Sequence, residues 1–272
     1  MQEKFIDIDK VIKDKNPKLL TILPKFIINY IKRVVHEDDV NEILHDLKDV
    51  HDYEFCAALI NRLNIKINVS GLENIPKDGG FIFASNHPLG GMDAMALVTV
   101  IEPYRKDVKF IVNDILLNIK NLNGIFTGVN KHGGNTKNSL KLVDDLFASD
   151  RAVFVFPAGM VSRRKNGVIA DLEWKKTFIT RAKKHNKPIV PVNVEGSLTN
   201  FFYRLSNLRM ALGVKTNLEM FYLSDESFKQ QDKTLNIVFG KPIPASHFDA
   251  TKSDKEWSKW MQNKVHEMGD NK

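Results

Sequence analysis

The chain has 272 residues, and 43% of them are hydrophobic, so it is long enough to bury the core of one large α/β domain. Its one cysteine, Cys56, excludes a disulfide framework and any cysteine-based metal site. The formal charge of +7 favours acidic partners, without choosing among nucleic acid, anionic lipid and an acidic carrier protein.

Targeting and recognition signals are few. No run of about 18 apolar residues occurs, which argues against a transmembrane helix. The start of the chain, Met1-Gln2-Glu3-Lys4, does not read as an export signal, so we expect a cytoplasmic protein. Zinc-finger spacings and RNA-binding motifs are also missing from the sequence, and we expect no nucleic-acid partner.

Residues 1–64 are predicted to form a helical segment. Within it, Leu19–Val35 is strongly apolar and carries a basic stripe at helical spacing, with a bend expected at Pro24. The basic residues of this stripe include Lys18, Lys25, Lys32 and Arg33. Two interpretations remain open: a helix packed on the main domain with its stripe in water, or a helix lying in an anionic membrane interface.

From residue 65 to residue 245, apolar strands alternate with helical patterns, and 246–272 is predicted to be a C-terminal helix. The predicted strands are 65–69, 81–85, 108–112, 152–156, 188–194, 218–223 and 235–239, and the predicted helices are 94–101, 116–122, 139–148 and 171–186. This alternation predicts an α/β fold with a mixed, largely parallel sheet flanked by helices. Loops that follow the strands are then the expected ligand-binding positions.

The loop after the buried strand 81–85 reads Asn86-His87-Pro88-Leu89-Gly90-Gly91-Met92-Asp93. The two glycines allow a sharp turn that can bring Asp93 back to the His87 ring. A carboxylate that accepts from one ring nitrogen leaves the other nitrogen free as a general base. The alternative is structural: His87 closes a turn, and Asp93 caps the helix that begins at residue 94.

Three later segments complete a pattern, namely 125–131 (Ile-Phe-Thr-Gly-Val-Asn-Lys), 153–164 with its Phe-Pro-Ala-Gly loop, and 189–196 with its strand Ile-Val-Pro-Val. In order and content, the four blocks resemble those of the glycerolipid (lysophospholipid) acyltransferase superfamily, over about residues 60–245. The loops are most similar to those of the bacterial lyso-ornithine-lipid and lyso-glycine-lipid acyltransferases. Three departures stand out: one extra residue between His87 and Asp93, Ala158 where the superfamily has a glutamate, and Asn130 and Lys131 near the position where the second block has an arginine.

The resemblance implies the glycerolipid acyltransferase fold and an O-acyltransferase that moves a fatty acyl chain from acyl carrier protein or acyl-CoA to the hydroxyl of a lyso-lipid. It implies no cofactor or metal besides the thioester co-substrate, and an enzyme bound peripherally to the inner face of the cell membrane. A lyso-amino-acid lipid is the expected acceptor. The alternatives are lysophosphatidic acid as acceptor, or an inactive lipid-binding scaffold, since block three lacks its glutamate.

The resemblance also assigns roles to residues. His87 is expected to be the general base and Asp93 its orienting carboxylate. Arg163, Arg164 and Lys131 are expected to bind the anionic head of the acceptor, because guanidinium groups match carboxylate and phosphate equally well. Two further residues, Asn86 and Gly159, are expected at the substrate, with backbone amides around Gly159 as donors to the thioester oxyanion.

Overall fold

The computed structural model describes residues 4–113, 117, 119–129 and 136–270, which form two compact units. A helical unit comprises residues 1–50 and 198–231, and an α/β unit comprises 51–197 and 232–272. The sequence placed the first boundary near residue 64 and did not separate 198–231 from the α/β domain. Among the described residues, no helix is at once long enough and apolar enough to cross a bilayer.

The helical unit consists of short helices from two parts of the chain: α1 (Ile8–Lys15), α2 (Pro17–Ile22), α3 (Lys25–Val34), α4 (Glu37–Asp46), α9 (Asn200–Ala211), the 3-10 helix η4 (Leu218–Tyr222) and α10 (Leu223–Phe228). The predicted bent helix 19–35 is in fact two helices. Pro24, which has no N–H to donate, is the N-cap of α3 and separates it from α2.

Residues 218–223 were predicted to be a strand, and that prediction is wrong. The segment is η4, because buried Glu219 accepts a hydrogen bond from Arg209 Nε of α9 at 2.8 Å and holds the segment in a tight turn beside that helix. The apolar residues that suggested a strand, Leu218 and Phe221, are exposed.

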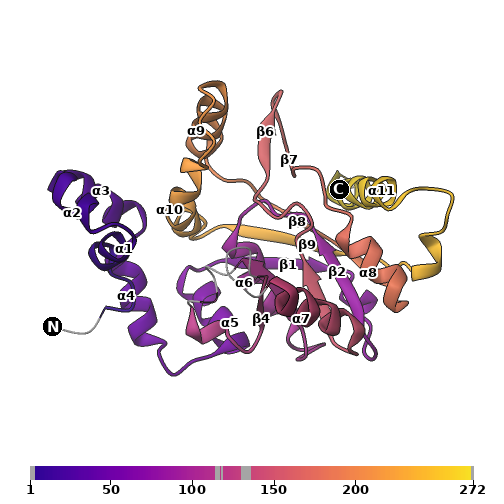
Figure 1. The fold of residues 1–272 in the computed structure, drawn as a ribbon. Coiled ribbons are helices and arrows are strands. Elements are labelled where there is room, and N and C mark those ends of the chain that lie inside the picture. The colour runs from indigo at the N-terminus through magenta and orange to yellow at the C-terminus, as the bar shows by residue number, and fades with distance from the viewer. Residues whose placement is uncertain (1–3, 114–116, 118, 130–135, 271–272) are drawn as a thin grey trace. The chain divides into compact units, whose positions relative to one another are not determined.

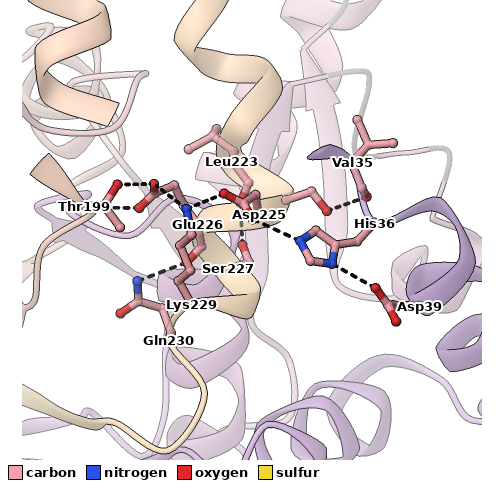
Figure 2. Close-up of polar contacts among 11 residues, drawn as sticks. Val35, His36, Asp39, Thr199, Leu223, Asp225, Glu226, Ser227, Lys229 and Gln230 are labelled. Atoms are coloured by element: carbon pink, nitrogen blue, oxygen red, sulfur yellow. Dashed lines mark hydrogen bonds and ion pairs between the residues drawn. The ribbon is translucent and has the colours of Figure 1, made fainter. Parts of the chain in front are cut away.

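A polar network joins the two parts of the helical unit (Figure 2). His36, between α3 and α4, has left-handed backbone with φ +55°. Its Nδ1 lies 2.8 Å from an oxygen of Asp39, and its Nε2 lies 3.1 Å from an oxygen of Asp225 in α10. The ring also stacks on Phe228 at a centroid distance of 4.3 Å. These contacts bind residues 223–228 to the N-terminal helices.

The main sheet of the α/β unit (Figure 1) has seven strands in the order β1-β9-β8-β2-β5-β3-β4. Their bounds are β1 (Lys66–Ser70), β2 (Phe81–Ser85), β3 (Lys109–Asn113), β4 (Phe126–Val129), β5 (Ala152–Val155), β8 (Ile189–Glu195) and β9 (Thr234–Phe239). All pairings are parallel except β8 with β9, which confirms the predicted mixed, largely parallel sheet. A separate hairpin, β6 (Arg163–Lys165) with β7 (Val168–Ala170), was not anticipated.

Helices flank the sheet: α5 (Asp52–Arg62), α6 (Gly91–Ile101), α7 (Thr136–Ala148), α8 (Thr177–His185) and α11 (Asp254–Asp270), with 3-10 turns η1 (Leu72–Asn74), η3 (Lys120–Leu122) and η5 (Ala245–His247). Every residue of β2 is buried. Ile82 and Ala84 pack in one cluster with residues of α8 and α11. The alternate residue Phe83 lies in an aromatic group with Phe154 and Phe239. This two-sided burial explains why the strand reads as a continuous apolar run.

Two helices begin elsewhere than predicted. The helix expected at 94–101 starts at Gly91, so Asp93 lies within its first turn. The helix expected at 171–186 starts only at Thr177, and the residues before it, including Asp171 and Trp174, form a connection with buried polar contacts.

Candidate active site

The loops singled out by sequence meet at the carboxyl ends of three adjacent central strands. β2 pairs in parallel with β5 on one side and with β8 on the other, with Ala84 opposite both Val155 and Pro191. The loops that leave β2 and β5 therefore emerge at the same edge, the position where open α/β sheets bind their ligands.

His87 and Asp93 form a direct pair. Nδ1 of His87 lies 3.0 Å from Oδ2 of Asp93, which also accepts the backbone N–H of Leu89 at 2.9 Å. Asp93 is fully buried, whereas the His87 side chain is 17% exposed. The aspartate thus combines both interpretations drawn from sequence: its carboxylate reaches back over the start of α6, as a capping residue does, and it also holds the imidazole.

The extra residue between His87 and Asp93 is accommodated by the backbone at Gly90. This residue has φ +70°, a conformation that side-chain-bearing residues rarely adopt, and α6 starts directly after it. Asp93 N–H donates to the Gly90 carbonyl at 3.1 Å, which closes the first turn of the helix.

An aromatic ring packs against the face of the imidazole and leaves Nε2 at its free edge. The His87 ring stacks on Phe156 at a centroid distance of 4.1 Å and an interplanar angle of 25°. Its Nε2 has no hydrogen-bond partner among the described residues, while Nδ1 is held by Asp93. A neutral imidazole with its proton on Nδ1 presents Nε2 as a proton acceptor.

Burial raises the pKa of the Asp93 carboxyl, and the hydrogen bond and positive charge of His87 act in the opposite direction. Within the described part of the chain, its second oxygen, Oδ1, has no hydrogen-bond partner. An ionised Asp93 is therefore compensated through Oδ2 alone, by His87 and the Leu89 N–H, and an imidazolium at His87 is stabilised in return.

A second carboxylate, which the sequence reasoning missed, holds the backbone of the histidine loop. Asp171 is buried and accepts three hydrogen bonds: from His87 N–H at 3.2 Å, from Ser162 Oγ at 2.5 Å and from Trp174 Nε1 at 2.8 Å. Ser162 N–H donates in turn to the His87 carbonyl at 2.9 Å. Asp171 was read as the start of a helix, and no local pattern relates it to a histidine 84 positions earlier.

Asn86, expected at the substrate, uses both ends of its amide on β8. Its Nδ2 donates to the Val194 carbonyl at 2.8 Å, and its Oδ1 accepts the Val194 N–H at 2.7 Å. The histidine loop approaches the end of β8 so closely that a Cβ at Gly196 would lie 2.8 Å from a methyl carbon of Leu89. Asn86 and Gly196 thus fit the loop to the neighbouring strand.

Gly159 lies in the turn after β5. Its N–H donates to the Phe156 carbonyl at 2.9 Å and its φ is +67°, so its own amide closes the turn. The Lys175 ammonium group comes within 3.2 Å of the position that a Cβ on Gly159 would take. The polar groups next to this glycine therefore include Lys175, which was not among the predicted site residues.

The two arginines differ in their surroundings. Arg163 is only 6% exposed, and its Nη1 donates to the Val161 carbonyl at 2.7 Å, so it supports the loop from inside. Arg164 is half-buried in β6 and is the more accessible of the two. Lys131 lies outside the described residues.

Comparisons with known proteins agree with this geometry. A family model described as acyltransferase matches residues 10–271. The lyso-glycine lipid O-acyltransferase of Bacteroides thetaiotaomicron is 43% identical over 265 residues, which cover 97% of each chain. The protein of the same name from Phocaeicola vulgatus is 40% identical over 97% of this chain and 95% of its own.

The fold also matches a solved structure. The crystal structure of the 1-acyl-sn-glycerophosphate acyltransferase from Thermotoga maritima aligns with a TM-score of 0.51 and 17% identity, over 90% of this chain and 89% of that one. That likeness shows the acyltransferase fold, and the match of the family model spans nearly the whole chain. With His87 and Asp93 paired at the edge of such a sheet, the chain belongs to the acyltransferase family.

Proposed function

We propose that this O-acyltransferase transfers a fatty acyl chain from the thioester of acyl carrier protein or coenzyme A to the hydroxyl of a lyso-glycine lipid. The observation that carries the chemistry is the His87–Asp93 pair, with Nδ1 held at 3.0 Å and Nε2 available. The acceptor is inferred from the two relatives that bear this activity in their names, at 43% and 40% identity.

The reaction needs one proton acceptor and no covalent enzyme intermediate. The acceptor hydroxyl gives its proton to His87 Nε2 as its oxygen attacks the thioester carbonyl carbon. The C–S bond then breaks, and the imidazolium returns the proton to the leaving thiolate, so that an ester and a thiol are released. Asp93 keeps the other proton on Nδ1 and stabilises the imidazolium. General-base catalysis of this kind contributes on the order of 10²–10⁴ in rate.

Anion recognition is assigned to residues after β5. The acceptor head carries a carboxylate, which a guanidinium binds through two parallel hydrogen bonds. Arg164 is the better placed of the two arginines for this contact because Arg163 is buried against the backbone. Lys131 remains a proposed second contact.

The test is an acyl-transfer assay with purified enzyme, a radiolabelled acyl donor and three acceptors: lyso-glycine lipid, lyso-ornithine lipid and lysophosphatidic acid. We expect lyso-glycine lipid to give the highest kcat/KM, and His87→Ala to abolish transfer to it. Comparable rates with the thioesters of acyl carrier protein and of coenzyme A would mean that the enzyme accepts both acyl donors. Preference for lysophosphatidic acid would overturn the proposed acceptor, and no transfer to any acceptor would favour the scaffold alternative.

The N-terminal helices are proposed to hold the enzyme at the inner face of the cell membrane. Ile22, Phe26 and Tyr30 are spaced four residues apart and are all exposed. Lys18, Lys25 and Arg33 of the same region are exposed as well, whereas Lys32 is paired with Asp9. Apolar side chains flanked by basic ones favour an anionic lipid interface.

A further inference from the structure

The helical unit exposes a second group of apolar side chains, far from the N-terminal helices in sequence. Phe201, Leu208 and Leu212 are 47%, 57% and 69% exposed. Their spacing of seven and then four residues places Phe201 and Leu208 along one side of α9 (orange in Figure 1), with Leu212 following as its C-cap residue. The residues after the helix continue this exposure: Val214, Leu218 and Phe221.

The exposed side of α9 is distinct from the side that packs into the core of the helical unit. The helix already buries Phe202, Tyr203 and Ser206 on its other side. It therefore has two apolar stripes. One is buried within the helical unit; in the other, one edge of Phe201 packs on Tyr222 at a centroid distance of 4.9 Å, and Leu208 and Leu212 remain exposed. An exposed apolar strip of this length on a soluble surface usually marks an interaction site.

The charges around this strip are all of one sign. Residues 200–218 include Arg204, Arg209 and Lys215 and no aspartate or glutamate. The first acidic residue beyond them, Glu219, is fully buried and bound to Arg209. Arg204 and Lys215 are exposed and have no ion-pair partner in the described part of the chain. Arg204 lies on the same side of α9 as Phe201 and Leu208.

We propose that the segment 200–222 docks into an anionic lipid surface, as a membrane contact in addition to the N-terminal helices. Apolar side chains enter the interface, while Arg204 and Lys215 extend toward anionic headgroups. A second copy of the chain fits less well, since a symmetric contact through this strip would bring its like charges together. The inference rests on the proposed function only in that the acceptor is a membrane lipid.

The segment is held firmly enough to act together with the N-terminal helices. Thr199, the N-cap of α9, donates its backbone N–H to buried Glu226 at 2.6 Å, and Asp225 lies in the His36 network (Figure 2). Ser224 Oγ also donates to the Val35 carbonyl at 2.8 Å, just after α3. Two weak contacts on one unit bind more tightly than either contact alone.

The first test measures binding to vesicles of phosphatidylcholine alone and of phosphatidylcholine with one third phosphatidylglycerol. We expect wild-type protein to prefer the anionic vesicles. The double variant Leu208→Gln/Leu212→Gln should bind them about tenfold more weakly, because two apolar side chains no longer enter the interface. The pair Arg204→Gln/Lys215→Gln should lose a similar factor on anionic vesicles only.

Matched control variants come from the α/β unit. Tyr104 and Leu142 are also exposed, at 46% and 64%, and lie outside the helical unit. Tyr104→Gln/Leu142→Gln should bind vesicles as wild type does. All variants should keep the wild-type rate on detergent-dispersed acceptor. If the wild-type protein itself transfers no acyl chain to detergent-dispersed acceptor, that result counts against the proposed chemistry and not against the docking surface.

The second test reads insertion directly. Cys56 is buried and is the one cysteine of the chain, and burial raises the pKa of its thiol to about 12, so a cysteine introduced by Leu212→Cys can be labelled selectively. A polarity-sensitive fluorophore there should shift its emission to the blue on anionic vesicles. An unshifted probe on vesicle-bound protein overturns the proposal. So does concentration-dependent dimerisation that Leu208→Gln/Leu212→Gln abolishes, since the strip would then be a contact between copies.

Discussion

Replacing Asp93 by asparagine keeps the shape of the side chain and removes its charge. In the native protein one carboxylate oxygen lies 3.0 Å from His87 Nδ1. Opposite unit charges about 4 Å apart attract each other by about 4 kcal/mol at an effective dielectric constant of about 20. This energy is an upper bound on what Asp93 contributes to the imidazolium that forms during transfer. At about 1.4 kcal/mol for each factor of ten, Asp93→Asn should lower kcat by up to about 10³-fold.

The same substitution should not destabilise the fold. Burial raises the pKa of Asp93, so the native state binds this proton more tightly than the unfolded state does. The ionised carboxylate therefore costs stability at neutral pH, and this cost disappears as the pH falls below the native pKa. Asparagine removes the cost at every pH. Its melting temperature should equal or exceed that of the wild type at pH 7, and the difference should shrink on acidification.

Two measurements check this reasoning: single-turnover acyl transfer for kcat, and thermal unfolding between pH 4 and pH 8. Asp93→Ala is the harsher comparison, because it leaves a cavity and frees the Leu89 N–H. A kcat for Asp93→Asn within threefold of wild type would refute the catalytic role. A melting temperature several degrees below wild type at pH 7 would refute the assignment of Asp93 as a carboxylate that costs stability.

Other predictions concern residues around this pair. His87→Ala should abolish transfer while the chain still folds, with a lower melting temperature at pH 7 because buried Asp93 loses its partner; residual turnover near wild type contradicts the mechanism. Arg164→Ala should raise the KM of the acceptor far more than that of the donor, and Arg164→Lys should restore only part of the affinity because lysine keeps the charge without the fork. Gly196→Ala should cost about 1–3 kcal/mol of unfolding free energy, as its Cβ meets Leu89, and it should lower kcat more than KM. Asp171→Asn should lower kcat about tenfold because its NH₂ group faces the Trp174 donor, and Trp174→Phe in the same chain should recover part of the loss.

The catalytic pair could be predicted from the sequence because its two residues lie close together in the chain. His87 and Asp93 lie on one loop, and the apolar run before them matches β2 residue for residue, from Phe81 to Ser85. A fully buried parallel strand leaves such a run in the sequence, and the glycines beside it indicate the turn. The same kind of signal gave the correct positions of β5 and β8 to within a residue or two.

The hydrogen bonds that hold the histidine loop could not be predicted from the sequence, because they join residues that are distant in the chain. Asp171 binds the His87 backbone across 84 positions, and Asn86 binds Val194 across 108. Such pairs obey no spacing rule, and an asparagine or aspartate at the end of a strand suggests a turn or a cap. In the helical unit, the apolar residues of 218–223 favoured a strand, but the segment is a 3-10 helix in which Glu219 is buried and paired with Arg209.

The missing glutamate of the third block also finds its explanation in packing. Ala158, which stands in its place, is buried in the cluster that contains Trp174 and Phe178, where a carboxylate would lose its hydration. A buried carboxylate does reach this loop, but Asp171 supplies it from beyond the β6–β7 hairpin, through Ser162 Oγ and Trp174 Nε1. The departure therefore leaves the His87–Asp93 pair intact, and it argues against reading Ala158 as a sign of lost activity. With Ala158 in place of the glutamate, the carboxylate near the loop after β5 comes from Asp171 instead. The loss of kcat expected for Asp171→Asn tests this role of Asp171.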